Sequence, residues 1–164
     1  GCTDTLVASV MDADAVDALL AAGIKAGDAF DREIGGQVDA SAGAPVRVQG
    51  TVVAVSEALR RGAASTWITV SFGQGNLLVL SPALVQVMEL HELRDRGIEP
   101  ADFSIIAIKS RVHFRRGFHD TGFAPTILLV EPDEPFLGTV RLEALPYEHL
   151  KLGQFYPHGD PSFG

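Results

Sequence analysis

Cationic and imidazole side chains gather in one short stretch of this acidic chain, IIAIKSRVHFRRGFHD at residues 105–120. Ammonium and guanidinium groups form charge-assisted hydrogen bonds with carboxylates and oxyanions, and an imidazole adds a further donor or acceptor. The stretch therefore predicts a carboxylate or oxyanion site. Its candidate residues are Lys109, Ser110, Arg111, His113 and Arg115.

A purely structural role is the alternative for part of this cluster. Arg115, Arg116 and His119 fit the solvated face of one helix, paired with acidic residues nearby in sequence. The candidate acidic partners are Asp120, Glu131 and Asp133. His113 beside Phe114 fits either a functional histidine or a core histidine with satisfied hydrogen bonds. Both interpretations stay open on the sequence alone.

The elements on either side of the cluster determine where it lies. The apolar residues of 103–110 predict a buried strand more clearly than any other stretch of the chain, and a helix is expected to start near His113. Open α/β sheets bind ligands outside the carboxyl ends of their strands, and a helix start adds unpaired N–H groups that favour an anion. The predicted junction is therefore a suitable place for an anion site.

The order of elements predicts a single domain over residues 1–164, of the α/β or α+β class, with a mixed β-sheet flanked by helices. Apolar and β-branched runs bounded by turn residues mark the strands. Besides 103–110, the expected strands are 5–11, one within 26–45, 46–59, 65–73, 76–82 and 126–132.

Polar and glycine residues mark the ends of helices and the turns. Asp12 is the expected N-cap of a helix that stops at Gly23. A second helix is expected over 84–96, closed by Gly97. Gly50 is expected to produce a bulge or bend in its strand.

Composition and charge exclude several classes of function. The net charge of −8 and the pI near 5.0 disfavour nucleic acid and anionic membranes as partners. The single cysteine, Cys2, cannot form a disulfide within the chain, and no apolar run reaches the length of a membrane span. We therefore expect a cytoplasmic location and no membrane contact.

The chain lacks the motifs of a self-sufficient active site. HExxH and GxSxG are absent, and HELRD at 91–95 is not followed by a second histidine. Trimming of Gly1 would expose Cys2 as an N-terminal nucleophile, but an ordinary chain end is the simpler interpretation. We expect no metal to be bound by this chain alone.

Three blocks of sequence resemble the C-terminal domain of the microcystinase C (MlrC-like) metallopeptidases. GIEPADFSIIAIKSRVHFRRGF at 97–118 is similar to the family's Gly-Ile-Asp-Pro turn, buried strand and Lys-Ser-x-x-His-Phe segment. The stretch 11–39 is similar to its first helix and Gly-Gly-Lys-x-Asp loop, with Gln37 at the lysine position. LPYEHLKLGQFYP at 145–157 is similar to its terminal segment.

This resemblance implies one part of a two-domain, zinc-dependent hydrolase of peptide or amide bonds. The metal ligands of such proteins lie in the N-terminal domain. The resemblance thus implies that this chain is a fragment, that zinc belongs to the full-length protein, and that the partner is an N-terminal domain from the same precursor or a separate chain.

The resemblance also assigns roles for a small peptide-like substrate. Lys109, Ser110 and His113 match the family motif residue by residue. Lys109 and His113 are then the candidate catalytic groups, and Ser110 is a candidate substrate-binding group. Arg111 and Arg115 are candidate substrate-binding groups because of the charge of the cluster and not because of the resemblance. The alternative is a non-catalytic assembly domain whose basic cluster grips an acidic partner or a small anion. A homo-oligomer is compatible with either function.

Overall fold

The computed structural model describes residues 1–37, 43–60, 63–110 and 112–130. The chain divides into two compact units, Gly1–Ile127 and Leu128–Gly164. The sheet, the helices and the candidate site all belong to the first unit. Within the described ranges, no helix combines the length and the apolar character needed to cross a membrane.

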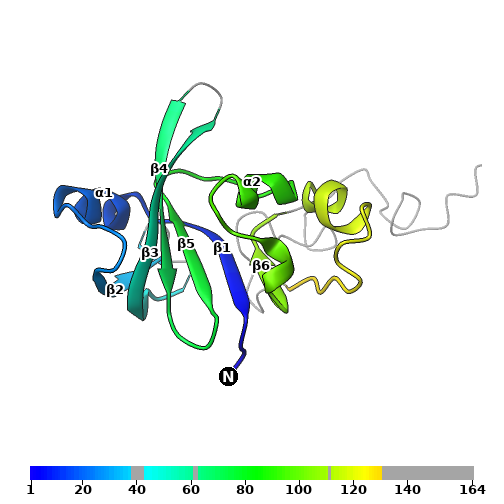
Figure 1. The fold of residues 1–164 in the computed structure, drawn as a ribbon, viewed down its shortest axis with the longest axis horizontal. Helices are drawn as coiled ribbons and strands as arrows, with labels where there is room; N and C mark the ends of the chain where they lie inside the picture. The colour runs from blue at the N-terminus through cyan, green and yellow to red at the C-terminus, as the bar shows by residue number, and fades with distance from the viewer. Residues whose placement is uncertain (38–42, 61–62, 111, 131–164) are drawn as a thin grey trace, which may run out of the picture. The chain divides into compact units, whose positions relative to one another are not determined.

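A six-stranded mixed sheet forms the centre of the first unit, in the order β2-β3-β4-β5-β1-β6 (Figure 1). Strands β5, β1 and β6 are parallel, and the pairs β2–β3, β3–β4 and β4–β5 are antiparallel. The predicted α/β class with a mixed sheet is therefore confirmed. The strands are β1 Thr5–Met11, β2 Ala29–Ile34, β3 Val46–Arg60, β4 Ala63–Ser71, β5 Leu77–Ser81 and β6 Ile105–Ile108.

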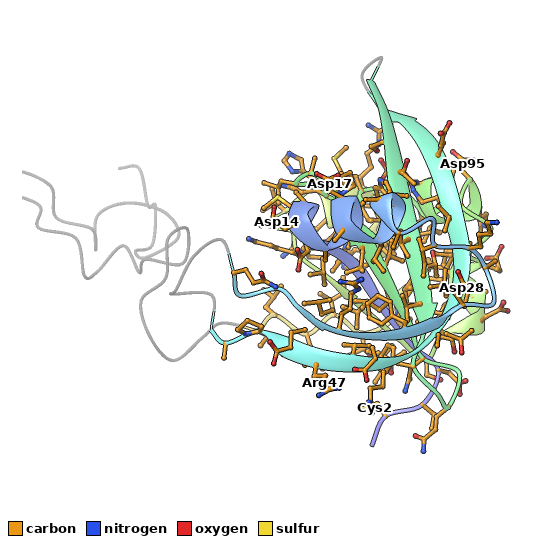
Figure 2. The ribbon with its side chains drawn as sticks, turned by 90° about the vertical axis from the view of Figure 1, so that its left-hand side faces the viewer. Cys2, Asp14, Asp17, Asp28, Arg47 and Asp95 are labelled. Carbon is orange, nitrogen blue, oxygen red and sulfur yellow. The ribbon has the colours of Figure 1, made fainter. Side chains whose placement is uncertain are left out.

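Helices of different length lie on opposite sides of this sheet, α1 on one side and α2 on the other (Figure 1). On one face Val16 and Leu19 of α1 (Ala13–Ala21) pack with Phe30 of β2 and with apolar residues of β4 and β5. Figure 2 shows side chains filling the space between α1 and the strands. Burial of this apolar face supplies most of the driving force that holds α1 in place.

The opposite face is covered by irregular chain and short helices. Its buried residues are Leu6, Ala8, Trp67, Val79, Val85, Val87, Leu93, Ile98, Phe114 and Phe118. Leu93 comes from α2 (Leu90–Arg94), and Phe118 comes from η3 (Arg115–His119), which is a single turn of π-helix. The short 3-10 helix η2 (Pro100–Asp102) forms the turn between α2 and β6, as the sequence predicts. The basic segment is thus anchored to the sheet by aromatic side chains.

The first helix begins where the sequence predicts. Asp12 follows β1 directly, and its Oδ1 accepts a hydrogen bond from the Ala15 N–H at 3.0 Å, which caps α1. Its Oδ2 accepts a second bond, at 2.9 Å, from the N–H of Gly35. Gly35 starts the predicted Gly-Gly turn after β2, with φ +67°, a conformation that glycine adopts without strain. Gly23, with φ +71°, follows the end of α1.

The bulge in β3 is not at Gly50. The β3–β4 register shifts between Val52 and Ala54, so the extra residue is Val53. A Cβ at Gly50 would collide with the carbonyl oxygen of Ser71 on β4. The glycine is therefore explained by the close approach of two backbones, which is the other common reason for a glycine inside a strand.

The predicted helix over 84–96 is too long at its start, because only Leu90–Arg94 form α2. Residues 84–88 are irregular, with Val85 and Val87 buried at 8% and 1% exposure and packed on the sheet. The Glu92 carboxylate accepts hydrogen bonds from the N–H groups of Met88 and Glu89, which fixes the start of the helix. Burial of alternate valines overrides the helix propensity of this stretch. Gly97, with φ +74°, lies just past the helix end as predicted.

Two predictions of buried strands also need correction. β6 lies at an edge of the sheet and covers only 105–108; its residues alternate in burial, and Ile105 is 46% exposed. Residues 126–130 form no strand, and Leu128 and Val130 are 83% and 90% exposed, while 131–132 lie outside the described residues. An apolar run does not reveal whether neighbouring strands cover both of its sides, and this explains both errors.

Candidate functional site

The carboxyl ends of the parallel strands lie together at one end of the sheet. Met11 of β1 pairs with Ser81 of β5, and Ala8 of β1 pairs with Ile108 of β6. Asp12 follows β1 and Lys109 follows β6, so both belong to this end of the sheet. It is the end at which open α/β sheets bind ligands.

After β6 the chain continues to η3, which packs closely against the segment before α2. Phe114 and Phe118 are buried at 6% and 4% exposure. Gly117 is also buried, and a Cβ at this position would collide with the Met88 carbonyl oxygen. Glycine is therefore required at this position for η3 to pack against residues 88–89. These two segments form the two walls of a pocket.

A pocket of about 330 Å³ lies between these two walls. It is lined by Met88, Glu89, Val112, His113, Arg115, Arg116 and Asp120. The lining combines guanidinium, imidazole and carboxylate groups with apolar side chains. Such a mixture suits a small polar ligand that carries a charged group.

The side chain of His113 contacts Gln86, which lies in the irregular segment before α2. Its Nδ1 lies 3.0 Å from Oε1 of Gln86, within hydrogen-bonding distance. Gln86 lies between Val85 and Val87, which are both buried. This contact joins the basic segment to the stretch that precedes α2.

Ion pairs account for part of the basic cluster. Nε of Arg116 lies 2.9 Å from Oε1 of Glu89, and Nδ1 of His119 lies 3.0 Å from Oδ1 of Asp120. The contact of His119 with Asp120 is one that the structural interpretation predicted, whereas Arg116 pairs with Glu89, which was not among the candidate partners. The candidate partners Glu131 and Asp133 lie outside the described residues.

Arg115 is different, because it forms no ion pair with a carboxylate within the described part of the chain. It is exposed, and its guanidinium carbon lies 5.5 Å from the centroid of the Phe114 ring. Because Arg115 lines the pocket, its donors are available to a bound anion.

Comparison with known protein families finds a match to the MlrC C-terminus over residues 1–148. The chain belongs to the MlrC C-terminus family. Among solved structures it is similar to a candidate metallopeptidase from Mesorhizobium sp. BNC1, with a TM-score of 0.57 and 17% identity. The similarity covers 71% of this chain and 25% of that chain, so this chain spans about a quarter of the length of that protein. No curated protein matches.

Within this MlrC C-terminal chain, the predicted site residues fall into different places. His113 and Arg115 line the pocket. Lys109 is exposed just past the end of β6 and does not line it, and Ser110 also lies apart from it. The Ser110 Oγ is buried and has no hydrogen-bond partner in the described ranges. Arg111 lies outside the described residues.

Two residues that line the pocket, and Gln86, which contacts His113, were not found from the sequence. Met88 and Glu89 belong to a stretch predicted as helix, and Gln86 carried no signal of chemistry. The Val-x-Val pattern around Gln86, with a period of two, favours extended chain and was the available signal. It would have placed Val85 and Val87 on one side and Gln86 on the other.

The described residues of this chain do not fit a zinc ion. No group of three or more His, Cys, Asp or Glu side chains converges within the described ranges. Zinc sites in proteins use at least three such ligands. The lining of this MlrC C-terminal pocket offers hydrogen bonding and charge pairing by Arg115, His113 and Glu89.

Proposed function

We propose that this chain is the substrate-binding part of a metallopeptidase-like hydrolase that cleaves peptide or amide bonds. Two findings support the proposal: membership of the MlrC C-terminus family, and the fold shared with the Mesorhizobium protein. The observation that carries it is the pocket in which an arginine without a carboxylate partner in the described residues, Arg115, accompanies His113.

The side chains take separate roles in this proposal. Arg115 binds the substrate carboxylate through charge-assisted hydrogen bonds. His113 contacts the substrate close to the bond that is cleaved. Lys109 does not line the pocket, so its proposed role, to stabilise negative charge that develops on the carbonyl oxygen, requires a substrate that extends beyond the pocket toward the end of β6. Ser110, whose buried hydroxyl lies apart from the pocket, is proposed to act indirectly through the segment that carries His113, and Arg111 is proposed to assist in binding the substrate.

The proposed partner is an N-terminal domain that carries zinc and its ligands. Residues 1–164 are then one part of a longer protein, either continuous with that domain or joined to it as a separate chain. The substrate is small and peptide-like, and the proposed location is the cytoplasm.

Replacement of Arg115 in the two-domain protein tests this function. Loss of a charged hydrogen bond costs about 1.5–3 kcal/mol, so Arg115→Ala should raise KM for a carboxylate-bearing peptide by about 10- to 150-fold. His113→Ala should lower kcat with little change in Tm. Arg94→Ala is the matched control, since this guanidinium pairs with Glu99 and does not line the pocket, and the KM of this variant should stay close to that of the unmodified protein. An unchanged KM for Arg115→Ala contradicts the proposal.

The apolar edge of β6 favours a second candidate, a non-catalytic assembly domain. Ile105 is exposed, and no described strand pairs with the outer side of β6. Exposed apolar edges are sites at which another chain adds a strand. In this case the basic cluster grips the acidic surface of the partner. Association that weakens as salt rises, without hydrolysis of any peptide, would identify this function.

A further inference from the structure

We propose that Gln86 is a positioning residue that holds the neutral ring of His113 in its Nδ1–H form, so that Nε2 accepts a hydrogen bond from an N–H group of the substrate. This inference rests on the proposed function, because it assigns a partner to one side chain of the same pocket. It also narrows the substrate to molecules that carry both an anionic group and an N–H donor.

The orientation of the Gln86 amide decides which ring nitrogen of His113 is protonated, and in the structure the amide oxygen faces the ring. Oε1 of Gln86 is an amide oxygen and can only accept, and it lies 3.0 Å from Nδ1 of His113. Nδ1 must then carry the proton. A neutral imidazole has one N–H, so Nε2 keeps its lone pair and acts as an acceptor.

Both partners of this bond are held in place by buried neighbours. Gln86 is flanked by Val85 and Val87, and the Val85 carbonyl accepts a hydrogen bond from Oγ of Ser9 on β1 at 3.1 Å. His113 is followed by Phe114, which is buried in the core. The hydrogen bond itself is exposed to solvent, but it joins two backbone segments that these buried neighbours anchor.

His113 and Arg115 would therefore bind different groups of the substrate. An acceptor at Nε2 suits the N–H of an amide or amine and cannot donate to a carboxylate or an oxyanion. Anionic groups are left to the guanidinium of Arg115, which lines the same pocket. A peptide with a free carboxylate and a nearby amide N–H satisfies both groups at once.

Nitrogen-15 NMR of the histidine rings in the full chain tests the protonation state directly. At a pH of about 8, above the ordinary imidazole range, His113 should show a protonated Nδ1 and an unprotonated Nε2. His113→Gln identifies its signals. Gln86→Leu should remove this preference, and Gln86→Glu, which keeps an acceptor oxygen, should restore it. His119 is the internal control, since its contact with Asp120 is unaffected by these changes.

A protonated Nε2 in the unmodified chain would overturn the inference, because it means that the amide nitrogen of Gln86 faces the ring. Unaltered signals in Gln86→Leu would overturn it as well. In the two-domain protein, Gln86→Leu should lower kcat/KM about fivefold, the worth of one neutral hydrogen bond, with Gln86→Glu closer to the unmodified protein. The NMR result does not depend on activity, so its failure is distinguishable from a failure of Arg115→Ala, which tests the proposed function.

Discussion

The carboxylate of Asp12 joins the start of α1 to the turn after β2. One oxygen accepts the Ala15 N–H and the other accepts the Gly35 N–H, while the residue is only 4% exposed. Asp12 and Gly35 are 23 residues apart in the sequence, so this contact links the first helix to the Gly-Gly turn. A single buried carboxylate thus fixes two segments at the carboxyl end of β1.

Asp12→Ala should therefore destabilise the protein strongly. Loss of an N-cap costs about 1 kcal/mol, and a buried N–H left without a partner costs about 1–3 kcal/mol more. We expect a total loss of about 2–4 kcal/mol in the free energy of unfolding, measured by urea denaturation with an unchanged m-value. Asp14→Ala is the control, because Asp14 is exposed on the same helix and labelled in Figure 2; it should change stability by about 0.5 kcal/mol or less. Equal losses for the two variants would contradict the assignment.

Arg96 and Trp67 give a second prediction about stability. The Arg96 guanidinium carbon lies 3.5 Å from the centroid of the buried Trp67 ring. Lysine cannot stack its charge flat on the ring, so Arg96→Lys should cost about 1–2 kcal/mol. Trp67 is the chain's only tryptophan, so its fluorescence reports the change directly. Arg94→Lys is the control, because it alters only an exposed pair with Glu99 and should cost about 0.5 kcal/mol or less. A similar loss of stability in both variants would contradict a special role for the stacking of Arg96 on Trp67.

Local signals in the sequence were enough to predict much of the fold. β1, the Asp12 cap and the glycine after α1 depend on neighbours within a few residues, and they were predicted correctly. The stretch 84–89 was not, because Val85 and Val87 are buried by strands that are distant in sequence. The edge position of β6 also depends on which strands pair, which a single apolar run does not encode.

The candidate site was also predicted only where it depends on residues that are close in sequence. The sequence placed His113 and Arg115 in one basic cluster, and both line the pocket. It could not pair His113 with Gln86, since 27 residues separate them and a glutamine carries no charge signal. It also grouped Lys109 with these residues, and Lys109 does not line the pocket.

Gly117→Ala tests whether the two walls of the pocket must touch. The added Cβ would collide with the Met88 carbonyl oxygen and lie 2.8 Å from Cα of Glu89, so η3 must move away. We expect a loss of about 1–3 kcal/mol and a change in the His113 ring signals in nitrogen-15 NMR. Gly23→Ala has open space around its Cβ and only its φ of +71° as a source of strain, which costs about 1–2 kcal/mol. The two variants should therefore lose similar stability, and unchanged His113 signals in Gly117→Ala would contradict the close packing.

Asp31 and Arg47, on the strands at the other edge of the sheet, predict a small dependence of stability on pH. The hydrogen bond from Arg47, helped by one from Gln49, lowers the pKa of Asp31 to about 2. Because the pKa is lowered on folding, the stabilisation is present above the unfolded value of about 4 and is lost as the pH falls through about 2. The effect on stability is small, since both side chains are exposed to solvent.

An NMR titration of the Asp31 carboxyl carbon should have its midpoint near 2, and Arg47→Gln should raise this midpoint toward the ordinary value. Arg94→Gln, which removes the partner of Glu99 instead, should leave the Asp31 midpoint unchanged; a midpoint near 4 in the unmodified protein would mean that the Asp31–Arg47 pair does not form in solution.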